Sequence, residues 1–189
     1  MRLTWPKVSK PIRIAGCLLA LTPFIFLCLP VCFGVREEAL QVSCLSKEKE
    51  QGAALLLYAL DFDDHLPPAV TWMDASLPYL KRVDSQPNRN NTVNIDSLRR
   101  CPSVQSAGPE DYGYAMNSLL SGPPLSKLKA PETQPLLFDS DWLWRNAHAP
   151  GLTSLANPAR HNWGSPRDIV TYADGHAKSI LVPGNLAHP

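Results

Sequence analysis

The chain has 189 residues, of which 44% are hydrophobic and 19% are charged, a size and composition that fit one ordinary folded domain with additional segments. Its charges are unevenly placed. Four basic residues precede the first long apolar stretch: Arg2, Lys7, Lys10 and Arg13. The rest of the chain contains the other 14 basic residues and all 17 acidic ones. The part after that stretch is therefore weakly acidic, which excludes the basic surface expected of a nucleic-acid-binding protein.

Residues 14–35 form an uncharged stretch, IAGCLLALTPFIFLCLPVCFGV. As a helix rising about 1.5 Å per residue, it would span roughly 33 Å, enough to cross the hydrocarbon core of a bilayer. Residues 1–13 carry basic side chains and no acidic one, so the positive-inside rule places them in the cytoplasm. The sequence predicts a single-pass protein of the inner (cytoplasmic) membrane, with the lipid bilayer as a partner and residues 36–189 outside.

A cleaved signal segment is the alternative to a membrane anchor. Cys32 and Gly34 are small residues at the −3 and −1 positions of a possible signal-peptidase site. The apolar stretch is longer than the roughly 7–15 residues usual for the core of a signal peptide, which favours the anchor.

Residues 36–62 lack proline, begin with acidic residues and place apolar side chains among polar neighbours. These apolar residues are Leu40, Cys44, Leu55, Tyr58 and Leu60. The pattern predicts an amphipathic helix that continues from the membrane into the exported part. Its apolar ridge would pack against a small sheet.

Residues 63–189 change in character, because short apolar runs now alternate with turn-forming residues. A short helix is expected within residues 72–83. Strands are expected within residues 111–117, 134–140, 168–174 and 176–182. Residues 142–166 show no clear period and are expected to form a long surface loop. The predicted fold class is α+β, with a long N-terminal helix packed on a small antiparallel β-sheet that belongs to a β-rich head.

Asp174 and Gly175 separate the last two predicted strands. An Asp-Gly pair is typical of a two-residue type I′ hairpin turn, in which both residues need a positive φ. A structural turn therefore explains this pair without a chemical role. His176, at the start of the return strand, is expected to be a surface or packing residue.

Short motifs along the chain occur in the order found in a bacterial family. They include SCLS (43–46), LPP (66–68), YGYAMN (112–117), RH (160–161) and YADGHAK (172–178). From residue 28 onward the chain resembles the prepilin-type, pseudopilin-like proteins whose C-terminal signature is a histidine, nine residues and Asp-Gly. The resemblance implies a pilin-like head, a structural or accessory role in a type II secretion or type IV pilus-like system, and other pilin-like subunits as possible partners.

Two features depart from that family. Twelve residues, rather than nine, separate His161 from Asp174, so the loop after His161 is longer than the family signature has it. Residues 8–13 read VSKPIR, with Val8 where the processing site has glycine and Arg13 where it has glutamate. We therefore expect that prepilin peptidase does not process the chain, and that it lacks the buried glutamate with which such subunits pair during assembly.

Cysteine placement fits an exported head. Cys17, Cys28 and Cys32 lie in the apolar stretch, where they serve as small hydrophobic residues. Cys44 and Cys101 remain, and a pair in an oxidising compartment suggests one disulfide between the long helix and the head. The alternative is two free thiols, since two cysteines alone are too few for a zinc site.

Several polar residues could converge on a divalent ion. They are Asp139, Asp141, His148, His161, Asp174 and His176. Turn aspartates and a loop histidine explain the same residues without a metal, so no metal site and no cofactor are assigned. No recognised catalytic or nucleotide-binding motif occurs, and we expect a protein that is not an enzyme.

Two classes of function are compatible with these features. The first is a membrane-anchored pilin-like structural or accessory protein. The second is an anchored extracytoplasmic binding module for a glycan, a peptide or a divalent ion, for which Trp142, Trp144 and Trp163 would form the surface. Rings packed inward would favour the first class, and rings clustered on an open face would favour the second.

Overall fold

The computed structural model describes residues 10–83, 95–104, 108, 111–162 and 164–182, and within these ranges it describes the side chains except those of residues 10–33, 81–83 and 95–96. The chain forms two compact units, residues 1–38 and 39–189. The basic segment of residues 1–9, most side chains of the predicted membrane span, and Trp163 lie outside the described residues.

The first helix, α1, runs without interruption from Lys10 to Asp61. Its backbone therefore includes both the predicted span and the predicted amphipathic helix that follows. Among the described residues, no helix combines the length and the apolar character needed to cross a membrane.

Shorter elements make up the rest of the described chain. The helices are η1 (Ala69–Thr71), α2 (Trp72–Ala75), α3 (Leu77–Val83), α4 (Ile95–Leu98), η2 (Ser118–Leu120), η3 (Leu125–Lys127) and η4 (Pro131–Thr133), where η denotes a 3-10 helix. The strands are β1 (Tyr114–Asn117), β2 (Pro135–Asp139), β3 (His148–Ala149), β4 (Arg167–Tyr172) and β5 (Ala177–Leu181). All four predicted strand regions contain a strand, and the predicted short helix is divided into α2 and α3.

The five strands form one sheet in the order β3-β1-β2-β4-β5. Strands β1, β2, β4 and β5 pair with their neighbours in antiparallel fashion, but β3 runs parallel to β1. The expected purely antiparallel sheet is therefore wrong, and so is the expectation that residues 142–166 form only a loop. A two-residue strand shows too little alternation of polar and apolar residues to be recognised in a sequence.

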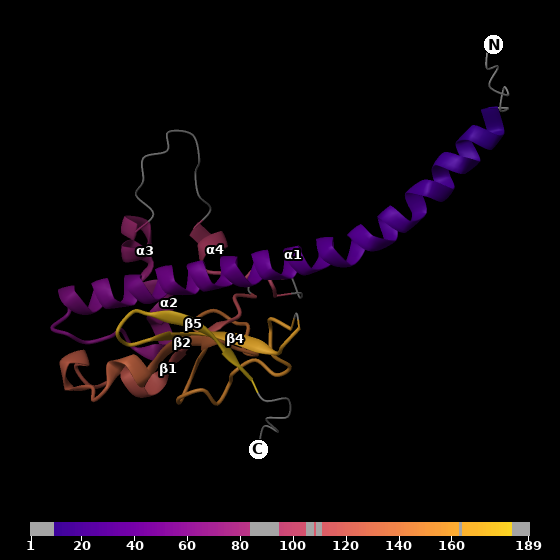
Figure 1. Cartoon of the computed structure of the whole chain (residues 1–189). Helices are drawn as coiled ribbons and strands as arrows, with labels where there is room; N and C mark the ends of the chain where they lie inside the picture. Colours follow the sequence, from indigo (N-terminus) through magenta and orange to yellow (C-terminus); the bar gives the residue numbers. More distant parts are fainter. Residues whose placement is uncertain (1–9, 84–94, 105–107, 109–110, 163, 183–189) are drawn as a thin grey trace, which may run out of the picture. The chain divides into compact units, whose positions relative to one another are not determined.

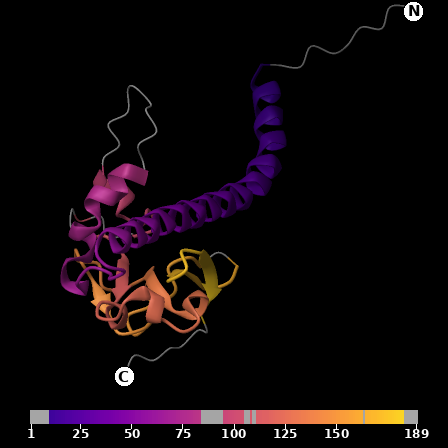
Figure 2. The same cartoon turned by 90° about the vertical axis from the view of Figure 1, so that its left-hand side faces the viewer.

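The sheet is covered on both faces. On one face, residues 39–61 of α1 lie over the strands, an arrangement visible in both views (Figures 1 and 2). The core between them includes Leu55, Trp72, Tyr114, Leu137 and Ile169. On the other face, the segment between β2 and β4 covers a second core. This core includes Ala115, Phe138, Leu155 and Val170. Neighbouring residues of these strands thus enter different cores, as Tyr114 and Ala115 do in β1, Leu137 and Phe138 in β2, and Ile169 and Val170 in β4. Burial on both faces explains why the strands are nearly continuous apolar runs in the sequence.

The buried stripe of α1 follows the period of a helix. Its residues are Cys44, Glu48, Gln51, Gly52, Leu55 and Ala59. Ala54, next to this stripe, is buried in a separate cluster with Tyr79 and Leu80. The expected ridge is correct at Cys44 and Leu55, but Leu40 and Tyr58 are only partly buried and Leu60 is 79% exposed. Gly52 allows the close approach of helix and sheet, because a Cβ at this position would lie 2.6 Å from the Thr171 methyl group.

Candidate functional site

A disulfide between Cys44 and Cys101 joins α1 to the loop that follows α4, with the two Cα atoms 5.0 Å apart. This confirms the predicted pairing. The bond closes a loop across 57 positions and holds residues 39–61 of α1 against the head, and both cysteines are buried members of the first core.

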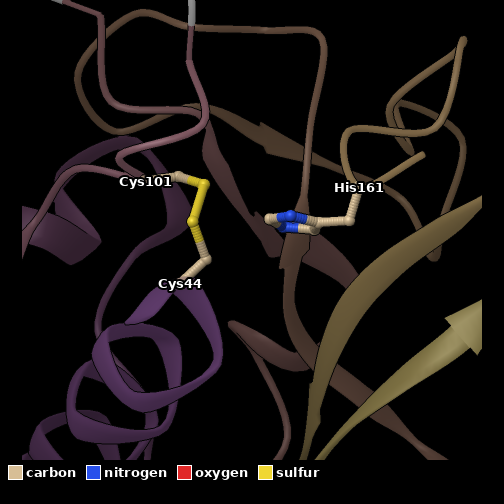
Figure 3. Close-up of side chains that lie close together, drawn as sticks. All are labelled: Cys44, Cys101 and His161. Atoms are coloured by element: carbon tan, nitrogen blue, oxygen red, sulfur yellow. A yellow bond between two sulfur atoms is a disulfide. The ribbon is translucent and has the colours of Figure 1, made fainter. Parts of the chain in front are cut away.

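His161 lies beside this disulfide, with its imidazole ring directed toward the two sulfur atoms (Figure 3). The ring is buried, and its Nε2 atom is 3.3 Å from Oδ2 of Asp139 at the end of β2. Its Nδ1 atom is 3.4 Å from the Ser103 hydroxyl. Since Nε2 is left without a well-aligned hydrogen bond, its relation to Asp139 is mainly electrostatic.

Asp139 is fixed from two other directions. Its Oδ2 atom accepts a hydrogen bond of 2.8 Å from the backbone N–H of Ile169. Its Oδ1 atom lies 3.4 Å from Nε of the buried Arg160. The carboxylate thus carries one backbone hydrogen bond and faces one permanent cation and one imidazole, which is how a fully buried charge is tolerated.

Two further acids are buried near Asp139. Burial raises the pKa of the Glu48 carboxyl well above its usual range, the negative charge of Asp139 raises it further, and contacts with Thr171 partly oppose the change. Burial and the charge of Asp139 also raise the pKa of Asp168 to about 7, although the N–H of Arg160 donates a 2.7 Å hydrogen bond to its Oδ1. At neutral pH, Asp168 is accordingly close to half-protonated, and burial favours the protonated form of Glu48.

The phenol of Tyr114 belongs to the same buried region. It donates a 3.3 Å hydrogen bond to the backbone carbonyl of Cys44. Burial, with the charges of Asp139 and Glu48, raises the pKa of Tyr114 well above its usual range, so the hydroxyl stays a donor. The hydrogen bond ties β1 to α1 next to the disulfide.

The turn between β4 and β5 contains Asp174 and Gly175, as expected, but its geometry differs from a type I′ turn. Of the two turn residues, only Gly175 has a positive φ, of 90°. The Gly175 N–H donates a 2.9 Å hydrogen bond to the Tyr172 carbonyl, and the Tyr172 N–H donates one of 2.8 Å to the His176 carbonyl. This is a three-residue loop that ends in a glycine bulge. Such a loop needs a positive φ at the glycine alone, so Asp174 keeps an ordinary conformation.

His176 and Asp174 form a separate, partly exposed pair at this turn, with His176 Nδ1 2.6 Å from Asp174 Oδ1. The His176 ring also stacks on Tyr172, with ring centres 4.5 Å apart. Desolvation raises the pKa of Asp174, but hydrogen bonds from the backbone and the ring of His176 together outweigh it, so this pKa lies below its usual value. Local turn and stacking contacts account for both residues.

The remaining predicted ligands have local roles as well. Asp141 accepts a 2.9 Å hydrogen bond from the Asn157 N–H, and His148 Nδ1 is 2.9 Å from the Asn146 carbonyl. The six candidates therefore do not converge on one ion, although Asp139 and His161 do meet. Within the described part of the chain, one group of three potential ligands lies close together, and it consists of Cys44, Cys101 and His161.

A surface pocket of about 370 Å³ adjoins this region. Its lining includes Ser103, Asp141, Leu143, Pro158 and Arg160. Ser103 thus has one side toward His161 and another toward the pocket, which makes it the link between the buried cluster and the surface.

The tryptophans divide between core and surface. Trp72 is buried and donates a 2.8 Å hydrogen bond to the Ala147 carbonyl. Trp142 and Trp144 are 39% and 52% exposed, and their rings stack with centres 5.1 Å apart. Two of the three rings proposed for a binding face are therefore on the surface.

Sequence reasoning missed Glu48, Asp168, Ser103 and Arg160. Glu48 could have been found, because it lies four residues after Cys44 and seven before Leu55, on the same face of the helix.

Comparisons of the chain with protein-family models, curated proteins and solved structures gave no match.

Proposed function

We propose that the chain is a membrane-anchored, pilin-like protein with a structural or accessory role in a type II secretion or type IV pilus-like system. Prepilin peptidase leaves it unprocessed, and residues 14–35 anchor it in the inner membrane with the head outside. This role requires no catalysis and no cofactor.

One observation carries the proposal. A single helix of 52 residues ends in a part that packs, through a helical stripe of buried side chains, onto a sheet formed by the rest of the chain. This is the arrangement that the resemblance implies for a pilin-like head. Support also comes from the disulfide, because such bonds persist in oxidising compartments outside the cytoplasm.

Membrane fractionation tests the anchor. The full-length protein expressed in a bacterium should sediment with membranes and stay there after washes with alkaline carbonate and high salt, and detergent should release it. A matched variant with Leu18→Arg and Phe24→Arg places two charges in the span, each costing about 2.5–3.5 kcal/mol on insertion scales, and should move to the soluble or aggregated fraction. Wild-type protein extracted by carbonate alone would contradict the proposal.

A binding module remains the second candidate, and the exposed Trp142–Trp144 stack favours it. Exposed stacked aromatic rings suit a sugar ring or an aromatic side chain. Binding of the detergent-solubilised protein to a panel of glycans, compared with Trp142→Ala and Trp144→Ala, tests this. Phe62→Ala is the control, because it removes another exposed ring. A Trp72 variant would not serve, because Trp72 is buried. Equal glycan binding by all forms, or none, would exclude this candidate for glycans.

A further inference from the structure

We propose that Cys44, Cys101 and His161 form a metal site, for zinc or a similar thiolate-preferring cation, when their disulfide is reduced. The inference does not depend on the proposed function. It concerns a site that the disulfide closes and reduction opens.

The first argument is the placement of the three ligands. The two cysteine sulfur atoms and one ring nitrogen of His161 lie within 4.8 Å of one another, and all three residues are buried. They come from α1, from the loop after α4 and from the segment before β4, so the fold rather than local sequence brings them together (Figure 3). Two thiolates and an imidazole are a ligand set typical of zinc sites.

The second argument is the orientation of the histidine. Metal-bound histidines usually point their other ring nitrogen at a carboxylate, which fixes the ring and increases its basicity. His161 has a carboxylate at this position, since Asp139 Oδ2 lies 3.3 Å from Nε2 and is itself held by the Ile169 N–H, and the negative charge of Asp139 favours a proton on Nε2. A proton on Nε2 leaves Nδ1 as the electron-pair donor.

The Ser103 hydroxyl connects Nδ1 with the sulfur side of the site. It is 3.4 Å from Nδ1 and 3.8 Å from the Cys44 sulfur, so it contacts both ligands. A metal with three protein ligands keeps a fourth position for water or a hydroxyl, and Ser103 is placed to fill it or to hold a water there. Because Ser103 also lines the surface pocket, the pocket offers a route for the ion.

Opening the site requires a two-electron reductant for the disulfide, and a dithiol can supply those electrons. The dithiol transfers two electrons and two protons to the Cys44–Cys101 bond, yielding two cysteine thiols and the oxidised dithiol. A divalent ion then displaces the two thiol protons and binds the two thiolates and Nδ1. The resulting centre has no net charge, which suits its buried position. Disulfide and metal exclude each other because they use the same two sulfur atoms.

Cobalt(II) is the probe that tests the site, because it replaces zinc and reports its ligands by colour. Full-length protein in mild detergent is reduced with excess dithiol, freed of dithiol without oxygen and titrated with cobalt. We expect one cobalt per chain, a thiolate-to-cobalt charge-transfer band, the strong visible bands of a tetrahedral ion, and displacement by zinc. The oxidised protein should show none of these bands.

Variants separate the ligands from their neighbours. Cys44→Ser should abolish the charge-transfer band or halve it, His161→Ala should weaken cobalt binding at least tenfold, and Asp139→Asn should weaken it about tenfold through the ring orientation. His176→Ala is the matched control, since it removes another histidine paired with an aspartate and should leave cobalt binding unchanged.

A measurement on the wild-type protein guards against variants that fail to fold. X-ray absorption of the zinc-loaded reduced protein should show two sulfur ligands and at least one imidazole nitrogen. Three results would overturn the proposal: no charge-transfer band in the reduced wild type, a zinc coordination shell without sulfur or without imidazole, or loss of the near-UV circular dichroism of the head on reduction alone.

Discussion

His161 Nε2 lies 3.3 Å from Asp139 Oδ2, and both side chains are buried. Asp139 also accepts the Ile169 N–H and faces the Arg160 guanidinium. One carboxylate therefore stabilises a buried imidazole, a buried cation and a backbone amide at once.

Removal of this carboxylate should strongly destabilise the head. We expect Asp139→Ala to lower the free energy of unfolding by about 3–5 kcal/mol, because it leaves Arg160 buried without its partner and the Ile169 N–H without an acceptor. Urea unfolding of the full-length protein in mild detergent, followed by near-UV circular dichroism, measures this. Asp141→Ala, which removes an exposed aspartate two residues away, should cost about 1 kcal/mol or less. Similar losses for both variants would show that Asp139 is not central.

Stability should fall as the pH rises from about 4 to about 7. The pKa of Asp168 is raised to about 7 and that of Glu48 well above its usual range, so the folded protein binds more protons than the unfolded chain in this interval. The stabilisation from these two carboxyls is fully present below the pKa values that they have in the unfolded chain. It is lost as they ionise in the folded protein, which lowers the free energy of unfolding by roughly 2–4 kcal/mol. Urea midpoints at about pH 5 and about pH 8 measure the change.

Neutral variants of the two acids provide the control for this pH effect. Asp168→Asn and Glu48→Gln should each reduce the difference between the two midpoints, and the double variant should nearly remove it. Glu132→Gln changes an exposed carboxyl and should leave the difference as it is in the wild type. A protein that becomes more stable with rising pH would contradict the assignment.

Close contact between α1 and β4 should make Gly52 intolerant of any side chain. We expect Gly52→Ala to lower the free energy of unfolding by about 1–3 kcal/mol, because its new Cβ would lie 2.6 Å from the Thr171 methyl group. The gain in helix propensity, about 1 kcal/mol, offsets only part of this cost. Gly122→Ala is the matched control, since nothing lies within 4 Å of its added Cβ. Stabilisation by Gly52→Ala would mean that helix and sheet are further apart.

The disulfide should contribute about 4 kcal/mol in the chain-entropy model for a loop of this length. Cys44→Ser with Cys101→Ser should show this loss in urea unfolding and still fold, because the two cores remain. Cys17→Ser, in the apolar stretch, is the control and should have little effect on the head. Unfolding energies unchanged in the double variant would show that the bond does not form in the native protein.

Much of the fold could be predicted from the sequence. The four longer strands were recognisable because apolar runs lie between turn-forming residues, and the disulfide because Cys44 and Cys101 were the two cysteines left outside the apolar stretch. The parallel strand β3 could not be recognised, because two residues are too few to show the alternation of polar and apolar side chains that marks a strand. The turn at Asp174 was placed correctly but assigned the wrong type, because the Asp-Gly pair fits both a type I′ turn and a three-residue loop that ends in glycine.

Most of the buried polar cluster could not be predicted, for a physical reason. The spacing of Glu48 places it on the buried face of the helix, but a carboxyl side chain ordinarily favours solvent, and nothing near Asp168 in the sequence marks it as buried. Burial raises the pKa of both carboxyls and so favours their uncharged forms. His161 and Asp139 meet only because the segment between β2 and β4 folds back across the sheet. This is a tertiary contact that cannot be predicted from the spacing of residues along the chain. The same event places His161 beside the disulfide.

The intact mass of the protein purified from membranes tests the central claim most directly. An anchored, unprocessed protein should have the mass of a chain that begins at or next to Met1, lowered by two hydrogen atoms for the Cys44–Cys101 bond. A chain beginning near residue 9 would indicate ordinary prepilin processing, and one beginning at Val35 would indicate a released head. Either of those masses would contradict the proposal of an unprocessed membrane anchor.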